Sequence, residues 1–205
     1  MSPEPSTDPN TDPNTEPAAV NPARRAWVLV AVAVFALALD MLTKTLVVAD
    51  LEPHHDTVRL LGGVLYLDVI RNSGAAFSMA TGMTWVLSLI AVAVVVAIIW
   101  VAPRLRSVGW AVGLGLVLAG ALGNLVDRIF RAPGPLRGHV VDFLSVFGAN
   151  GRYYPVFNLA DSAICVGGVL IVLMALFGHD YDGGVARRHK LAQTARTSSS
   201  SEPRR

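Results

Sequence analysis

The chain has 205 residues, of which 53% are hydrophobic and only 16% are charged, and its formal net charge is +2. Soluble domains carry about 25% charged residues, and the apolar residues here gather in blocks. The composition therefore indicates an integral membrane protein and argues against a soluble domain. A single cysteine, Cys165, excludes an internal disulfide, and its apolar neighbours predict a packed thiol. We expect no metal, no other cofactor and no nucleic-acid partner.

Residues 1–22 repeat a Thr-Asp-Pro-Asn unit and hold almost nothing to bury, which predicts a disordered acidic, proline-rich tail. Arg24 and Arg25 then precede an apolar run, about 26–48, that is long enough to span the roughly 30 Å of a bilayer core. A signal peptide cleaved near Ala38 is the alternative. Because the run continues past that residue, we favour a membrane span.

Two charged residues interrupt this first span. Asp40 and Lys44 lie four residues apart, on one face of a helix, where they could form an ion pair. One interpretation is a pair that anchors the helix near the membrane interface. The other is a role in supporting the site or contacting a substrate, and the sequence alone leaves both open.

The next segment, 49–82, is mixed in character and lies between two apolar runs. Residues 57–61 and 64–70 are rich in β-prone side chains, and Gly62 and Gly63 stand between them. Two such runs around a pair of glycines predict a β-hairpin.

A polar turn follows the hairpin. Asn72 offers both donors and an acceptor, and the small residues from Gly74 onward would let the backbone approach a ligand closely. A turn that merely leaves a strand is the plainer alternative. The adjacent residues His54, His55 and Asp56 invite a metal interpretation. No further ligand is suitably spaced nearby, so a solvated loop is favoured.

Three further apolar runs predict membrane spans at about 83–101, 108–130 and 156–177. Within the second of these, Gly109 and Gly113 have the GxxxG spacing that lets helices pack closely in lipid. We therefore assign these glycines to packing and not to chemistry.

Polar residues gather where the spans end, and such groups are costly at membrane depth, which makes them candidates for a functional site. Asn124, Asp127 and Arg128 fall on one face of the third span. Because arginines lie nearby, our preferred interpretation of Asp127 is structural. It would form an ion pair with Arg128 or Arg137 that holds the helix ends together.

Four spans place both termini on one side of the membrane. Basic residues flank the spans on that side and recur in the polar segment 179–205, which predicts that this side is the cytoplasm. The segments 49–82 and 131–156 then lie outside, and the polar residues converge on the outer face. The predicted organisation is a disordered tail over 1–22, a four-helix membrane domain over 23–178, and a disordered basic tail from 179 onward.

Two further carboxylates could act together at the outer face. Asp142 falls in the outer segment and Asp161 about one turn into the fourth span, so the two side chains can meet there. Paired carboxylates share a proton, so that one can deprotonate water while the other polarises a carbonyl and later protonates the leaving amine. This is aspartyl-protease chemistry, and Asn158, on the same helix face as Asp161, could orient that residue. A purely structural ion pair is the alternative.

Other hydrolytic mechanisms find less support. The GxSxG motif is absent, and no recognisable motif pairs a histidine with Ser73 or Ser162. Cys165 has no activating neighbour in the sequence.

Five motifs together resemble one family, the bacterial lipoprotein signal peptidases, also called signal peptidase II. In chain order they are DMLTK at 40–44, NSGAAFS at 72–78, GNLVDR at 123–128, VVDF at 140–143 and FNLADS at 157–162. They occur in the family's order and at compatible spacing across about residues 26–178, so both tails lie outside the resemblance. The segment 132–136 is longer than the family usually has there.

The resemblance implies an aspartyl endopeptidase of the bacterial plasma membrane, with four transmembrane helices and a small extracytoplasmic β-sheet, around residues 57–71, that cradles the substrate. Its substrates would be diacylglyceryl-modified prolipoproteins, cut on the N-terminal side of the lipidated cysteine. We expect a monomer in contact with membrane lipid. By the motif match, Asp142 and Asp161 become the catalytic dyad. The substrate-binding and supporting residues become Asp40, Lys44, Asn72, Gly74, Asn124, Asp127, Arg128 and Asn158.

Two other classes of protein remain as alternatives. A small proton-coupled transporter could use Asp40, Asp127 and Asp161 as a relay, but it predicts carboxylates spread through membrane depth and often inverted repeats. Here the carboxylates gather at one face. A non-catalytic membrane assembly factor predicts that Asp142 can be replaced by Asn without loss of activity.

Overall fold

The computed structural model of the chain describes residues 24–54, 57–74 and 84–182. The expectations for most of the two tails, for His55 and Asp56, and for the small residues after Gly74 lie outside these described residues.

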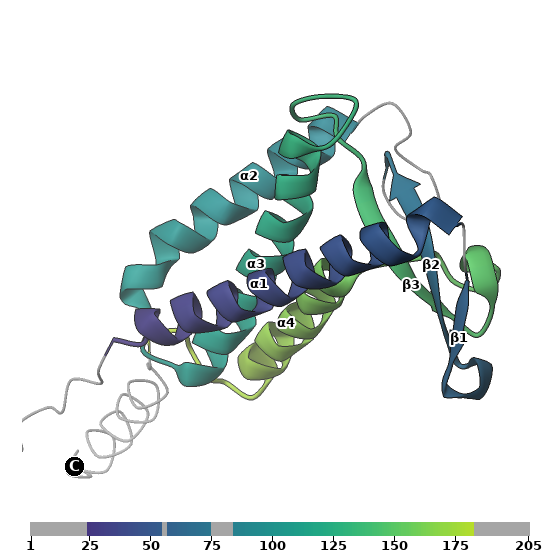
Figure 1. The fold of residues 1–205 in the computed structure, drawn as a ribbon. Coiled ribbons are helices and arrows are strands. Elements are labelled where there is room, and N and C mark those ends of the chain that lie inside the picture. The colour runs from purple at the N-terminus through teal and green to yellow at the C-terminus, as the bar shows by residue number, and fades with distance from the viewer. Residues whose placement is uncertain (1–23, 55–56, 75–83, 183–205) are drawn as a thin grey trace, which may run out of the picture.

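Four helices dominate the described part of the chain. They are α1 (Ala26–Asp50), α2 (Thr84–Val101), α3 (Val108–Phe130) and α4 (Leu159–Leu176). Each is long and apolar enough to cross a membrane, where a helix satisfies its backbone polar groups internally. Half of the apolar window of α3 is buried, against 11–17% in the other three, so α3 is the central helix (Figure 1).

The helices lie close to the predicted spans, and the largest difference is at the start of α4. Val156 and Phe157 are apolar, which placed them inside the predicted fourth span. In the structure the backbone amide of Phe157 donates to the oxygen of Leu144 across 3.0 Å, so this segment pairs with a strand. The helix therefore begins at Leu159, after a residue that caps it.

Glycines let α3 and α4 approach closely, as the GxxxG spacing predicted. A Cβ on Gly109 would lie 2.5 Å from the sulfur of Met174, and a Cβ on Gly167 would lie 2.6 Å from the backbone oxygen of Gly113. Real Cβ atoms do not come this close to other atoms. A side chain at position 167 would therefore push the helix backbones apart, whereas one at position 109 would first displace the flexible end of Met174.

The extramembrane segments form one three-stranded antiparallel sheet in the order β1-β2-β3. The strands are β1 (Val58–Leu60), β2 (Leu65–Asn72) and β3 (Val140–Val146). The β1–β2 hairpin agrees with the prediction, and its turn holds Gly62 and Gly63 at φ of +67° and +101°, which glycine adopts without strain. The third strand is new, because the sequence indicated only an outer segment there.

Strand β3 ties the sheet to the helices. Val141 and Phe143 are buried against Val47 near the end of α1, and the backbone amide of Val141 donates to Oδ2 of Asp127 in α3 across 3.2 Å. Figure 1 shows the sheet beyond one end of the helices, beside the C-terminal part of α1 and the start of α4. Four elements therefore converge at one junction.

The chain after α4 contacts the loop between α2 and α3. The backbone amide of Arg106 in this loop donates to the backbone oxygen of Tyr181 across 2.9 Å. The indole N–H of Trp110, at the start of α3, donates to the backbone oxygen of His179 across 2.6 Å. Contacts with the helices thus continue as far as Tyr181. The rings of Trp110 and Tyr181 also meet edge to face.

Candidate active site

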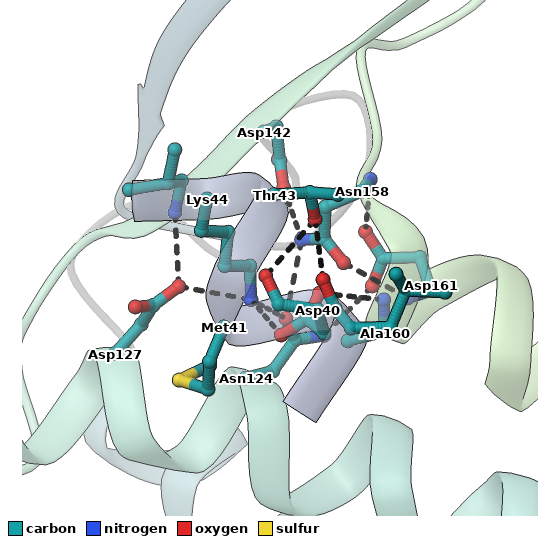
Figure 2. A network of polar contacts seen from close by, with 12 residues as sticks. Asp40, Met41, Thr43, Lys44, Asn124, Asp127, Asp142, Asn158, Ala160 and Asp161 are labelled. Carbon is teal, nitrogen blue, oxygen red and sulfur yellow. Dashed lines mark hydrogen bonds and ion pairs between the residues drawn. The ribbon is translucent and has the colours of Figure 1, made fainter. Parts of the chain in front are cut away.

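A network of polar side chains lies at this junction (Figure 2). Five of its members are among the most completely buried side chains in the described chain: Asp40, Lys44, Asp127, Asp142 and Asn158. Buried polar and charged groups are costly unless they are paired, so the contacts within the network decide how each group behaves.

Asn158 and Asp161 begin α4 as a reciprocal capping box. Oδ1 of Asn158 accepts from the backbone amide of Asp161 across 3.0 Å, and Oδ2 of Asp161 accepts from the amide of Asn158 across 3.2 Å. These bonds satisfy two amides that a helix start otherwise leaves unpaired. Asp161 is therefore the third residue of the helix, and Asn158 precedes the helix instead of lying on its face as predicted.

Asp142 stands in the middle of β3 and not in a loop, which corrects the prediction. Its Oδ2 accepts from Nδ2 of Asn72 on the adjacent strand β2 across 2.7 Å, and its Oδ1 accepts from Nδ2 of Asn158 across 2.6 Å. Asn72 is itself oriented, because its Oδ1 accepts from the amide of Gly74 across 2.9 Å. Two amides from different elements thus hold one carboxylate.

Asn124 of α3 connects this cluster to Asp161. Its Nδ2 donates to Oδ1 of Asp161 across 2.7 Å, and its Oδ1 accepts from Nδ2 of Asn158 across 3.2 Å. The two carboxylates are therefore linked through a pair of side-chain amides, as Figure 2 shows.

The environment of Asp142 favours its protonated form. Burial raises the pKa of this carboxyl from its ordinary 3.8 to about 7, and the negative charge of Asp161 adds to the increase, while the bonds from Asn72 and Asn158 oppose it. One carboxylate near another is the arrangement in which a proton is shared between the two.

Lys44 is fully buried. Its Nζ is 2.8 Å from Oδ2 of Asp40 and 3.0 Å from Oδ2 of Asp127. The pairing of Asp40 with Lys44 therefore agrees with the prediction. Oδ1 of Asp40 also accepts from the backbone amide of Ala160 across 2.9 Å, which attaches the first turn of α4 to α1. The pair is thus buried within the protein, where it connects α1 to the start of α4.

Asp127 forms ion pairs, but its partners differ from the predicted ones. It pairs with Lys44 and, through Oδ1, with Nε of Arg131, in place of Arg128 or Arg137. The cause is helical geometry, because residues four apart share a face and adjacent residues do not. The i,i+4 spacing of Asp127 and Arg131 could have revealed this pair from the sequence.

Arg128 is 8% exposed and almost unpartnered. Its Nη1 donates over a long 3.4 Å to the backbone oxygen of Asn124, and its Nε has no hydrogen-bond partner among the described residues. A buried guanidinium with a free donor is available to bind an oxygen acceptor.

A cavity of about 310 Å³ opens beside these groups. The polar part of its lining is Asn72, Asn124, Arg128, Asp142 and Asp161. Leu87 of α2 and the segment 154–157 supply apolar walls, so the cavity has the mixed lining typical of a ligand site. Cys165 also lines it and is exposed, which corrects the expectation of a packed thiol. In α4, Cys165 lies one turn after Asp161, on the same face of the helix.

Each of the ten residues predicted for the site either belongs to the network or lines the cavity. Leu87 and the segment 154–157 could not be assigned to the site in advance, because apolar residues there carry no chemical signal. In the described ranges, no three His, Cys, Asp or Glu side chains lie close enough together to hold a metal ion.

Two solved structures of a bacterial membrane enzyme have the same fold. The first, at 2.3 Å resolution, matches with a TM-score of 0.66 and 27% sequence identity, and the match covers 77% of this chain and 92% of the other. The second, at 1.9 Å resolution, matches with a TM-score of 0.63 and 28% identity, and the match covers 77% of this chain and 97% of the other. Together with its four apolar helices, this places the chain in the class of multi-pass membrane enzymes.

Sequence comparison narrows this class to one family. The family model for signal peptidase (SPase) II matches residues 32–177. The lipoprotein signal peptidase of Mycobacterium avium (strain 104) is 55% identical over 85% of this chain and 92% of its own length. The lipoprotein signal peptidase of Mycobacterium tuberculosis (strain ATCC 25618 / H37Rv) is also 55% identical, over 82% of this chain and 80% of its own length. The chain belongs to the signal peptidase II family of membrane peptidases, as its five motifs indicated.

Proposed function

We propose that the chain is an aspartyl endopeptidase that releases the signal peptide from diacylglyceryl-modified prolipoproteins, cutting on the N-terminal side of the lipidated cysteine. Asp142 and Asp161 form the catalytic dyad. The observation that carries the proposal is that these two carboxylates, from β3 and α4, line one cavity and are linked through the amides of Asn124 and Asn158.

The dyad acts by sharing one proton. The ionised carboxylate takes a proton from a water molecule, and the resulting oxygen attacks the scissile carbonyl carbon. The protonated carboxylate donates its proton to the carbonyl oxygen. When the tetrahedral intermediate collapses, the carbon–nitrogen bond breaks and the cysteine nitrogen receives a proton from the dyad. A pKa of about 7 for Asp142 supports this scheme, because the proton is then available near neutral pH.

Arg128 is positioned to bind the substrate. Its Nε is buried, unpartnered among the described residues and part of a side chain that lines the cavity. We assign the part of this guanidinium that lines the cavity to a carbonyl oxygen of the substrate, since the bond from its Nη1 to the backbone oxygen of Asn124 is long, at 3.4 Å. Asn72, Asn124 and Asn158 direct their N–H groups at the carboxylates, so their role is to hold the dyad.

Specificity follows from depth in the membrane. Arg24, Arg25, Arg104 and Arg106 lie at the helix ends away from the cavity, which supports a cytoplasmic location for both termini and an extracytoplasmic site. A diacylglyceryl chain anchored in the bilayer would hold the adjacent peptide bond at the level of the dyad. A precursor without this lipid should therefore be cut much more slowly.

The test is cleavage of a diacylglyceryl-modified prolipoprotein by purified protein in detergent. We expect Asp142→Asn and Asp161→Asn each to lose activity by on the order of 10³-fold or more while remaining folded. Asp50→Asn, an exposed carboxylate at the end of α1, is the matched control and should keep full activity.

Each alternative outcome has a defined meaning. A wild-type protein that cuts no such substrate would overturn the peptidase proposal and lead to proton-flux assays. Activity retained in one dyad variant would overturn the pairing and make Asp127 the next carboxylate to test. Equal rates with and without the lipid would overturn the argument from depth.

A further inference from the structure

We propose that Lys44 is a positioning residue of the dyad: its ammonium group fixes which way the side-chain amide of Asn124 faces, so that Asn124 presents its N–H₂ group to Asp161. This inference rests on the proposed dyad and extends it to a residue that cannot touch the substrate. Lys44 is fully buried and is not part of the cavity lining.

The ammonium group of Lys44 lies among side-chain oxygens. Three acceptor oxygens lie near Nζ, namely Oδ2 of Asp40 at 2.8 Å, Oδ2 of Asp127 at 3.0 Å and Oδ1 of Asn124 at 3.3 Å. The contact with Asp40 is an ion pair without an aligned hydrogen bond. An ammonium has three donors and no acceptor, so each group that faces Lys44 must present an oxygen.

This requirement sets the orientation of Asn124. With Oδ1 turned to Lys44, Nδ2 points the other way and donates to Asp161 across 2.7 Å. A flipped amide would place N–H₂ against the ammonium and against Nδ2 of Asn158, which now donates to Oδ1 across 3.2 Å. It would also place a carbonyl oxygen against the carboxylate of Asp161. Every contact of the flipped amide would be repulsive.

The amide of Asn158 is oriented by the start of α4. Its oxygen accepts from the backbone amide of Asp161, so its Nδ2 donates to both Asn124 and Asp142. In Figure 2, Asn124 lies between the ammonium group of Lys44 and Asp161. Lys44 therefore acts directly on the bond from Asn124 to Asp161, while the oxygen that Asn124 turns to Lys44 also accepts from Asn158.

The charged groups around these hydrogen bonds come from four elements and from the residue that follows α3. They are Asp40 of α1, Asp127 and Arg128 of α3, Arg131 directly after α3, Asp142 of β3 and Asp161 of α4. The positive charge of Lys44 also lowers the pKa of Asp142, against the larger increase caused by burial and Asp161. Loss of Lys44 should therefore both release the Asn124 amide and make the dyad harder to ionise.

The experiment removes the cation without leaving a new unpaired charge. In the double variant Asp40→Asn/Lys44→Met, one negative and one positive charge disappear together. The new amide at position 40 can still accept from the backbone of Ala160, and Asp127 keeps Arg131 and the amide of Val141. Asp40→Asn alone is the reference variant, because it makes the same change at position 40 and differs from the double variant only in keeping the ammonium group of Lys44.

We expect the double variant to lose about tenfold in kcat relative to Asp40→Asn. KM should stay unchanged because Lys44 does not reach the cavity. The acid limb of the pH–kcat profile should move to higher pH, which a merely structural role would not produce. In a cycle with Asn124→Leu, the part of the kcat effect that acts through this amide should disappear, whereas the displacement of the acid limb, which acts through the charge of Lys44, should remain.

A folded double variant with the kcat and pH profile of Asp40→Asn would overturn the inference. It would also be overturned if the effects on kcat of removing Lys44 and of Asn124→Leu were fully additive. If the double variant does not fold, Lys44→Arg replaces it. This variant keeps a donor-only cation and should retain the wild-type pH profile, so a displaced acid limb would overturn the inference. The proposed function has its own test, because it would be overturned if Asp142→Asn still cleaved the prolipoprotein.

Discussion

The side-chain amide of Asn158 donates to Oδ1 of Asp142 across 2.6 Å, so the residue that caps α4 also holds a carboxylate of strand β3. Its side-chain oxygen accepts from the backbone of Asp161 in the same helix start. One side chain therefore begins a helix and joins the two carboxylates of the proposed dyad, and the two roles can be separated by mutation.

Asn158→Ser and Asn158→Ala separate these roles. Serine caps helices nearly as well as asparagine, whereas alanine loses about 1 kcal/mol as a cap. We expect Asn158→Ala to be the less stable of the two by about that amount in detergent unfolding. Because neither side chain can replace the bond to Asp142, both should lose at least about tenfold in kcat. A serine variant with wild-type activity would show that the bridge does not matter.

The stability of the protein should depend on pH through Asp142. Burial, followed by the negative charge of Asp161, raises its pKa from 3.8 to about 7, so the native state holds this proton more tightly than the unfolded chain. The resulting stabilisation is complete below about pH 4 and is lost as the pH rises through 7. Asp142→Asn stays neutral and should therefore become more stable than wild type, by up to about 4 kcal/mol above pH 7.

The measurement is thermal unfolding of both proteins at pH 5 and pH 8 in the same detergent. The advantage of Asp142→Asn should grow with pH. If the difference in stability between the two proteins were equal at pH 5 and pH 8, the pKa of Asp142 would not be raised by the fold.

Two adjacent glycines of α4 should respond in opposite ways to alanine. A Cβ on Gly167 would lie 2.6 Å from the backbone oxygen of Gly113, whereas a Cβ on Gly168 meets nothing within 4 Å. Gly167→Ala should therefore destabilise the helix pair by about 1–3 kcal/mol. Gly168→Ala should be neutral or stabilising by up to about 1 kcal/mol, because alanine is the better helix former. Equal effects in detergent unfolding would contradict the close crossing.

Two arginines of the α3 region should also separate stability from activity. Arg128→Met removes a buried guanidinium whose Nε has no partner in the described chain, so the fold should keep or gain stability while cleavage falls at least about tenfold. Arg131→Met deprives Asp127 of a partner and should destabilise the protein with a smaller effect on cleavage by the folded fraction. The same unfolding and cleavage assays compare both variants, and the reverse pattern would remove Arg128 from the substrate site.

Much of this architecture follows from local sequence signals. Long apolar runs determine membrane spans because helices satisfy their backbone in lipid, and paired glycines between β-prone runs determine the hairpin. The pairing of Asp40 with Lys44 follows from helical spacing alone. The motifs then brought together residues that lie far apart in the chain, including Asn72 and Asp142.

Features that depend on distant partners could not be predicted in the same way. Strand β3 exists because it pairs with β2, about seventy residues earlier in the chain, and its apolar sequence carries no mark of that partner. Val156 and Phe157 resembled the start of a span, because the pairing of Phe157 with Leu144 is also non-local. By contrast, Asn158 with Asp161 three residues later is a local capping signal, and a closer analysis of helix starts would have located it.

The order of the elements along the chain has a consequence for biosynthesis. Asp142 lies on β3 and Asp161 on α4, which follows every other described element that contributes to the site. A growing polypeptide emerges N-terminal end first, so a chain that has not yet delivered its last helix to the bilayer holds one carboxylate and none of the bridging from Asn158. Hydrolytic capacity would thus arise only at the end of insertion, and prematurely terminated products would be unable to cut other proteins in the membrane.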